Sequence, residues 1–426
     1  MIKEVKNNVL YVDGCSTVDL AKKYGTPLYV YSENELISRL EELKRDFTSK
    51  YENTRVAYAS KAFCTAAMLK LCMEQGICTD VVSGGEIYTA MKAGFPPERV
   101  EFNGNNKQPS ELELAVDYGV GRFIVDSLQE LSLLESICAA RGKTANVLFR
   151  ITPGVRSDSH DYMVTGKKDS KFGIPLDEDV IYPQVKQAIE APHINFMGFH
   201  FHVGSQLFDN TSHLQALDIM LDVVKNVKER FGFDVTELNL GGGFGVTYTT
   251  EERKPASYFL QPMMARIEAF FEEMGVKRPA VVIEPGRSVV AEAGMTLYTI
   301  GSIKEIRDVR KYVSVDGGMT DNIRPALYQA VYDGVVANKA DVPKEEVVTV
   351  CGKCCESGDI LIRDIAVARP ESGDLFAVFS TGAYGFSMAS NYNRNPIPAV
   401  VFVRDGKDRL VVKRQTYEDM MRNEIL

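Results

Sequence analysis

Hydrophobic positions follow two alternating spacings over the first two-thirds of the chain. Short runs of β-branched and aromatic residues predict buried strands, and the longer segments between them carry apolar residues at i, i+3 and i+4, which predicts amphipathic helices. After the run at residues 55–60, Met68, Leu71 and Cys72 have this helical spacing. Eight strands are predicted in this way, at residues 55–60, 77–82, 99–102, 122–125, 146–151, 196–202, 237–240 and 280–283.

Eight consecutive strand–helix units have the size and rhythm of a (β/α)8, or TIM-type, barrel. We therefore expect an α/β protein whose barrel covers residues 38–290. The remaining sequence predicts strands joined by glycine turns, most plainly the hairpin around Asp405-Gly406. Residues 1–37 and 291–426 are expected to form a second, mainly β domain.

The composition narrows the class of partner. The chain has 426 residues, 45% of them hydrophobic and 25% charged, with a net charge of −9. These proportions are typical of a globular protein and offer no basic surface for nucleic acid or an anionic membrane. No apolar run reaches the roughly 18 residues that span a bilayer, and residues 1–6 lack the apolar core of a signal peptide. A cytoplasmic protein that acts on a small molecule is expected.

The cysteines indicate neither disulfides nor a metal. Eight in a chain of this length are too sparse for a disulfide framework and are expected to be thiols. Cys351, Cys354 and Cys355 form the one dense group. A Cys-x-x-Cys pair can begin a zinc site, but no second pair follows at zinc-ribbon spacing, and all five histidines lie before residue 214. No metal site is expected.

Reactive side chains gather at the carboxyl ends of the predicted strands, where a barrel carries its active site. Lys61 follows the first strand. Most lysines at strand ends are simply solvated, but one held at a barrel mouth can form a Schiff base with an aldehyde. Gly241-Gly242-Gly243 follow the seventh strand and Gly286-Arg287 the eighth, where barrels bind phosphate, although a glycine run alone could be only a tight loop.

Two further residues lie at these strand ends. Glu284 could merely pair with Arg287, but beside a phosphate site and a Schiff-base lysine a carboxylate can keep the ring nitrogen of pyridoxal phosphate protonated. His202, with Ser205, is expected to point toward the barrel mouth, where a flat imidazole could stack on the cofactor ring. His200 is expected to be a core histidine on the opposite face.

The candidates above lie in four short motifs, at residues 58–62, 202–206, 241–243 and 284–287, and three more motifs follow at residues 321–328, 355–359 and 382–385. In this order, and over nearly the whole chain, they resemble the alanine-racemase-like family of barrel-type pyridoxal-phosphate enzymes and, within it, the diaminopimelate decarboxylases. The resemblance implies that Lys61 carries pyridoxal 5′-phosphate as a Schiff base. The other implied cofactor contacts are His202, Ser205, Gly242, Glu284, Gly286, Arg287 and Tyr384.

The resemblance also implies a substrate and an assembly. Cys355 would donate a proton to the substrate, and the implied substrate contacts are Arg287, Arg324, Tyr328, Glu356 and Tyr384. Two arginines and a tyrosine suit a distal carboxylate and Glu356 a distal ammonium, which indicates meso-2,6-diaminopimelate, converted to L-lysine and CO2. In this family Cys355 and Glu356 reach the cofactor of the other subunit, which implies a homodimer with shared sites.

Several alternatives stay open. Lys353 and Cys354 stand where the family usually has a proline and an apolar residue, so either Cys354 or Cys355 could be the proton donor, and adjacency to Glu356 favours Cys355. Residues 158–166 vary from the family form and are not assigned to the site. The rival activities are an ornithine or arginine decarboxylase, an amino-acid racemase and a non-catalytic carrier of the cofactor.

Overall fold

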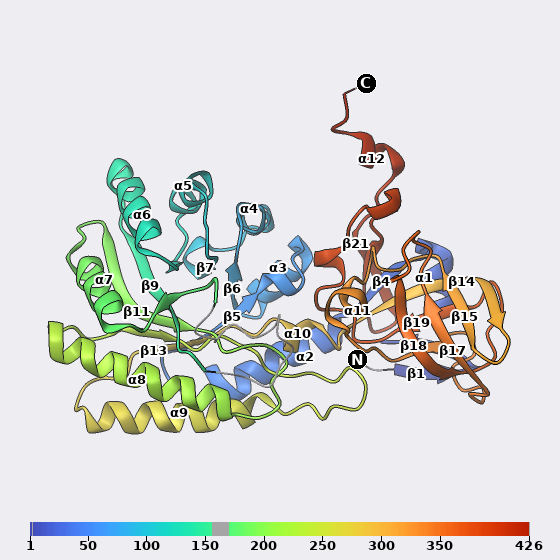
Figure 1. Ribbon diagram of the computed structural model, residues 1–426, viewed down its shortest axis with the longest axis horizontal. Helices are drawn as coiled ribbons and strands as arrows, with labels where there is room; N and C mark the ends of the chain where they lie inside the picture. The colour runs from blue at the N-terminus through green and yellow to red at the C-terminus, as the bar shows by residue number, and fades with distance from the viewer. Residues whose placement is uncertain (2, 156–169, 426) are drawn as a thin grey trace. The chain divides into compact units, whose positions relative to one another are not determined.

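The computed structural model describes residues 1, 3–155 and 170–425, and the chain divides into two compact units (Figure 1). The barrel unit comprises Leu40–Gly245 and Arg253–Ser288, and the β unit comprises Met1–Arg39, Val246–Glu252 and Val289–Leu426. Val246–Glu252 thus belongs to the β unit although barrel segments flank it in the sequence. Residues 158–166, which the sequence left unassigned, lie outside the described residues.

Eight parallel strands form the barrel. They are β5 Thr54–Ala59, β6 Cys78–Val81, β7 Val100–Phe102, β8 Arg122–Val125, β9 Ala145–Thr152, β11 Ile194–Phe201, β12 Glu237–Asn239 and β13 Ala280–Ile283, with the short β10 Ile174–Pro175 beside β9. The eight follow one another in chain order, and pairing of β13 with β5 closes the ring. The predicted (β/α)8 architecture and all eight predicted strands are confirmed, each within two residues of its expected ends.

The barrel helices are α3 Ala66–Glu74, α4 Gly84–Ala93, α5 Pro109–Tyr118, α6 Leu128–Arg141, α7 Glu178–Glu190, α8 Thr211–Phe231 and α9 Ala256–Glu273, preceded by α2 Glu33–Leu43. From α3 to α6 and from α7 to α9, each helix contacts the next around the barrel (Figure 1). The Ser83 and Ser127 hydroxyls cap α4 and α6 by accepting backbone N–H hydrogen bonds. Gly94 and Gly232 end α4 and α8 in the left-handed conformation, which glycine adopts without steric cost.

The β unit is built on one large sheet and one small one. The large sheet contains β4 Leu28–Ser32, β14 Gly294–Ile306, β15 Arg310–Val315, β16 Gly334–Val336, β17 Glu346–Cys351, β18 Ile360–Val367, β19 Leu375–Val378, β20 Ala399–Arg404 and β21 Lys407–Val412. The small sheet contains β1 Lys3–Lys6, β2 Val9–Val12 and β3 Cys15–Ser16, and the helices are α1 Thr17–Tyr24, α10 Arg287–Val290, α11 Arg324–Tyr328 and α12 Tyr417–Met421.

An amino-terminal strand, β4, pairs within the large sheet. Strand β4 pairs antiparallel with β14 and parallel with β20, and so joins two parts of the chain that are far apart in sequence. Met1–Arg39 therefore belongs to the β unit.

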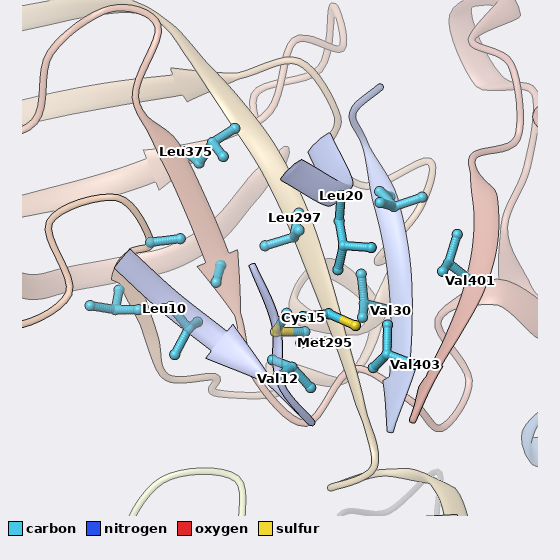
Figure 2. Packing of buried hydrophobic residues seen from close by; sticks show 14 of the residues in the cluster. Leu10, Val12, Cys15, Leu20, Val30, Met295, Leu297, Leu375, Val401 and Val403 are labelled. Carbon is cyan, nitrogen blue, oxygen red and sulfur yellow. The ribbon is translucent and has the colours of Figure 1, made fainter. Parts of the chain in front are cut away.

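The core of the β unit is aliphatic (Figure 2). Leu28 and Val30 of β4, Leu297 of β14, and Val401 and Val403 of β20 are buried completely. Figure 2 shows these side chains meeting residues of the small sheet, such as Leu10 and Val12, in one cluster. Because apolar burial contributes roughly 25 cal/mol per Å², this cluster is a major source of the unit's stability.

Candidate active site

Lys61 stands at the end of β5, in the short 3-10 turn Ser60–Ala62. Its neighbours Ser60 and Ala62 are buried, whereas Lys61 itself is exposed. The turn is anchored by Glu86, whose Oε2 accepts hydrogen bonds from Ser60 Oγ (3.0 Å) and Val82 N (2.7 Å). The lysine is thus held on a fixed piece of backbone with its amine accessible.

Glu284 follows β13 and is held by three donors. Its Oε1 accepts hydrogen bonds from Asn103 Nδ2 (3.0 Å) and Asn239 Nδ2 (2.8 Å), and its Oε2 lies 2.9 Å from His200 Nε2. Burial alone would raise the pKa of Glu284, but the hydrogen bonds and charges of His200, Lys61 and Asn103 lower it to about 2. Glu284 is therefore an anion at neutral pH.

His200 is buried as expected, but its contact with Glu284 shows that the expected face was wrong. The sequence placed it on the face opposite His202, but residues two apart on a strand point to the same side. His200 lies on β11 with its ring inside the barrel, 1% exposed, and pairs with the candidate cofactor residue Glu284.

His202 follows β11 and is fixed by the glycine loop. The Gly242 N–H donates a hydrogen bond to His202 Nδ1 (3.2 Å), so the ring proton of the neutral form is on Nε2. Burial, together with the charges of Lys61 and Arg150, lowers the pKa of His202 well below its usual range. The side chain is therefore a neutral, flat imidazole at neutral pH.

The loop Gly241-Gly242-Gly243 requires glycine for steric reasons. Gly241 and Gly243 have φ values of 67° and 103°, and a Cβ on Gly242 would lie 2.2 Å from the carbonyl oxygen of Glu284. From the other side, His213 Nε2 lies 3.0 Å from the Gly242 carbonyl oxygen. The backbone of this loop is thus held close to that of the loop after β13.

Two other predicted residues meet beside these loops. Arg287 Nε donates a hydrogen bond to Ser205 Oγ (3.1 Å), and the Arg287 side chain is 7% exposed. A Cβ on Gly286 would lie 3.0 Å from the Cβ of Ala59, so this glycine also permits a close approach. The barrel unit therefore brings together every candidate that it contributes, which are Lys61, His202, Ser205, Gly242, Glu284, Gly286 and Arg287.

Below Glu284 the interior of the barrel is a column of polar side chains that the sequence did not single out. Asn239 Nδ2 also donates to Glu101 Oε2 (3.0 Å), and Asn103 Nδ2 also donates to Asp80 Oδ1 (2.6 Å). Burial raises the pKa of Glu101 to about 8 and that of Asp80 well above its usual range. Asn239 and Asn103 end or follow strands, so the rule that identified Lys61 could have found them.

The remaining candidates lie in the β unit, and the first of them is Arg324 of α11. Arg324 is 4% exposed, and its Nη1 donates hydrogen bonds to the hydroxyls of Tyr248 (3.0 Å) and Tyr332 (2.6 Å). Burial disfavours the charged guanidinium, but these tyrosines and Tyr384 outweigh that effect, and the pKa of Arg324 is raised. The ring of Tyr328 centres 5.9 Å from the guanidinium carbon. Tyr248 and Tyr332 are neighbours that the sequence missed.

Tyr384 has an unusual backbone. Its φ is 62°, in the left-handed region that aromatic residues rarely adopt. The preceding Gly382 is packed so closely that a Cβ there would lie 1.9 Å from the carbonyl oxygen of Val290. Such backbone strain persists where the surrounding structure holds it and is concentrated at functional sites.

The two adjacent cysteines differ in environment. Cys355 is exposed, and its backbone N–H donates to Asn393 Oδ1 (2.7 Å). Cys354 is half-buried, and burial together with Asp359 raises its pKa to about 11. Glu356 is exposed, and its Oε1 accepts a hydrogen bond from Gly358 N (3.1 Å). The more accessible thiol and the candidate substrate carboxylate are therefore neighbours.

The described residues form neither a metal cluster nor a membrane-spanning helix. In residues 1, 3–155 and 170–425, no three His, Cys, Asp or Glu side chains are grouped so that they could hold a metal ion. Within the same residues, the structure contains no helix that is both long and apolar enough to cross a membrane.

The candidate residues of the barrel unit fit pyridoxal phosphate. Glu284 is a buried anion of the kind that a protonated pyridine nitrogen needs, and Lys61 offers an accessible amine for the aldehyde. The glycine loop and Arg287 suit the phosphate, and the neutral His202 suits the face of the ring. The aldehyde, the ring nitrogen, the phosphate and the ring face of the cofactor therefore each have a chemically matched residue.

Comparison with known proteins gives the class directly. Residues 34–291 match the family model described as "Pyridoxal-dependent decarboxylase, pyridoxal binding domain". This is the class that the barrel and its candidate site define.

Close relatives then narrow the family. The chain is 48% identical to the diaminopimelate decarboxylase of Bacillus subtilis, over 97% of this chain and 94% of that protein, and 40% identical to that of Staphylococcus aureus, over 99% of both. A crystal structure of the M. jannaschii diaminopimelate decarboxylase in complex with L-lysine superimposes with a TM-score of 0.93 at 36% identity, covering 100% of this chain and 98% of that one. The chain belongs to the diaminopimelate decarboxylase family of pyridoxal-dependent decarboxylases.

Proposed function

We propose that this protein uses pyridoxal 5′-phosphate to decarboxylate meso-2,6-diaminopimelate to L-lysine and CO2, the last step of lysine biosynthesis. Similarity over nearly the whole chain to curated diaminopimelate decarboxylases supports the reaction. The M. jannaschii relative, whose structure contains L-lysine, supports the product.

The observation in this chain that carries the proposal is the state of Arg324. It is a buried cation that donates hydrogen bonds to the hydroxyls of Tyr248 and Tyr332, and within the described residues no carboxylate forms an ion pair with it. An uncompensated buried charge is costly, so Arg324 is well suited to a substrate carboxylate. Diaminopimelate has a distal carboxylate, whereas ornithine, arginine and lysine do not.

Each candidate residue has a role in this reaction. When bound, pyridoxal phosphate supplies the electron sink for the bond that breaks as CO2 leaves. Lys61 holds the aldehyde end of the cofactor, Glu284 keeps its ring nitrogen protonated, and His202 stacks on the ring. The residues that would hold the phosphate are Ser205, Gly242, Gly286, Arg287 and Tyr384.

The substrate residues complete the assignment. Arg287 and Arg324, with Tyr328 and Tyr384, bind carboxylate, and Glu356 binds the distal ammonium. The Cys355 thiol gives its proton to the substrate Cα after CO2 has left.

We also propose that two copies of the chain form a homodimer in which Cys355 and Glu356 serve the partner's cofactor. Co-expressing Lys61→Ala and Cys355→Ala chains tests this. If the cysteine acts across subunits, each mixed dimer has one complete site, and a statistical mixture regains about a quarter of the wild-type activity. If Cys355 acts within its own chain, no combination is active.

The test of the reaction is CO2 release with added pyridoxal phosphate, measured side by side on meso-diaminopimelate, ornithine, arginine and lysine. Release from diaminopimelate alone, with lysine as the product, is expected. A site built to bind a polar group rejects an analogue that lacks it by roughly 10⁴-fold. Comparable release from ornithine or arginine would contradict the assigned role of Arg324. Racemisation of an amino acid without CO2 would contradict the reaction itself.

A further inference from the structure

We propose that His200 is a positioning residue that orients and ionises Glu284, so that Glu284 Oε2 is the atom facing the ring nitrogen of the cofactor. The inference rests on the proposed use of pyridoxal phosphate and concerns a residue of the chain to which no role has been assigned above.

The hydrogen bonds of Glu284 leave room for one more partner at a defined place. An ionised carboxylate has about four acceptor positions, two on each oxygen. Asn103 and Asn239 use both positions on Oε1, and His200 uses one on Oε2. The fourth position is therefore on Oε2, next to the imidazole.

The environment of His200 gives its ring no other polar role. The side chain is 1% exposed, and its Nδ1 has no hydrogen-bond partner among the described residues. Because an ionised carboxylate only accepts, the hydrogen atom between the two groups belongs to His200 Nε2. Glu284 is thus the one polar group that the ring contacts in the described part of the chain.

Without His200, Glu284 would have a donor on one side only. Hydrogen bonds to the charged form of an acid favour that form, and burial opposes it. Removing the Nε2 donor should therefore favour protonated Glu284, and a neutral carboxyl group no longer stabilises the positive charge of a protonated ring nitrogen. It should also free the Glu284 carboxylate to rotate, because the hydrogen bond from His200 fixes the position of Oε2.

Two substitutions separate this role from simple packing. His200→Leu fills the same buried space with an apolar side chain and removes the Nε2–H donor. His200→Gln places an amide N–H near the position of Nε2 and should restore the contact with Glu284.

The readouts are made on the holoenzyme. The 15N chemical shift of labelled pyridoxal phosphate reports whether the ring nitrogen carries a proton, and dialysis reports cofactor affinity. We expect His200→Leu to lose the protonated signal at neutral pH and to bind the cofactor roughly 10- to 100-fold more weakly, the loss typical of one hydrogen bond to a charged group. His200→Gln should stay near wild type on both.

Four results would contradict the proposed role of His200 or the proposed function. An unchanged nitrogen signal in His200→Leu, or equal losses in the Leu and Gln variants, would overturn the positioning role. A crystal structure of the wild-type holoenzyme gives a test that needs no variant: the ring nitrogen should lie nearest Oε2, and a contact to Oε1 instead overturns the inference. Failure of the wild type to form any borohydride-reducible link at Lys61 would overturn the proposed function itself.

Discussion

The barrel unit has a buried network of charged and amide side chains around Glu284, whereas the β unit has a buried cluster around Leu297 that is aliphatic. In the barrel, Glu237 pairs with Arg55 (2.6 Å) and Arg122 (3.1 Å), and Asn239 links Glu101 to Glu284 above them. In the β unit, the cluster around Leu297 contains no charged residue (Figure 2). The hydrogen bonds and ion pairs of the barrel network depend on direction, whereas the apolar contacts of the β-unit cluster do not.

The two kinds of interior have different roles. Apolar packing depends on volume, so neighbouring side chains can substitute for one another at modest cost. A buried hydrogen-bond network depends on each partner, because a lost donor leaves a charge unsatisfied. The barrel interior therefore fixes the position and ionisation of Glu284, and the aliphatic core holds the sheets together.

The largest expected effect is the loss of the cofactor link. Lys61→Ala should abolish the borohydride-reducible bond between protein and cofactor, because no other amine replaces an accessible lysine on an anchored turn. Peptide mass spectrometry after reduction is the measurement. Lys70→Ala, an exposed lysine on α3, is the control and should keep the link. A reduced adduct on another lysine would sink the assignment.

The next largest effect distinguishes the adjacent thiols of Cys354 and Cys355. Cys355→Ala should bind the cofactor normally but lose about 10²- to 10⁴-fold in kcat, the range for one acid–base group. Cys354→Ala should stay within a few-fold of wild type, since its half-buried thiol lies beside Asp359. Steady-state kinetics of both variants decide between them, and the reverse ranking would make Cys354 the donor.

Truncating the aliphatic core should affect stability alone. Leu297→Ala is expected to lower the free energy of unfolding by about 2–5 kcal/mol, because it leaves a cavity among fully buried neighbours. Val309→Ala, at a side chain that is 72% exposed, is the matched control and should change it by less than about 0.5 kcal/mol. Urea unfolding measures both. If Leu297→Ala proved as mild as the control, the core would have repacked.

The smallest effect is a change in pH dependence that originates in the barrel column. Burial raises the pKa of Glu101 from 4.5 to about 8, so between these values the folded protein holds a proton that the unfolded chain has lost. Stability from this group is thus present below pH 4.5 and is lost as the pH rises through about 8.

Glu101→Gln should remove that dependence. The slope of unfolding free energy against pH between 5 and 8 should become less negative by at most about 1.4 kcal/mol per pH unit. Urea unfolding at pH 5, 6, 7 and 8 measures the slope. Glu135→Gln, on helix α6, is the control. An unchanged slope would mean that Glu101 is ionised in the folded protein.

The sequence by itself determined the barrel and most of the candidate site. Strand and helix periods are local, and the rule that barrel chemistry sits after the strands placed Lys61, His202 and Glu284 without any knowledge of pairing. The glycine loop could also be found, because Gly241 and Gly243 have backbone angles that few other residues adopt.

Tertiary structure decided what depends on partners distant in the chain. The sequence did not predict β14, whose first half is buried and whose second half is exposed, because such a strand has no regular alternation. It also missed Tyr248, which reaches Arg324 from a segment 76 residues away. His200 was placed on the wrong face although alternation puts residues two apart on the same side, but its partner Glu284, 84 residues further along, is set by the tertiary structure. Local pattern specifies which face of an element is buried, but which polar groups meet there depends on the folded arrangement of the strands.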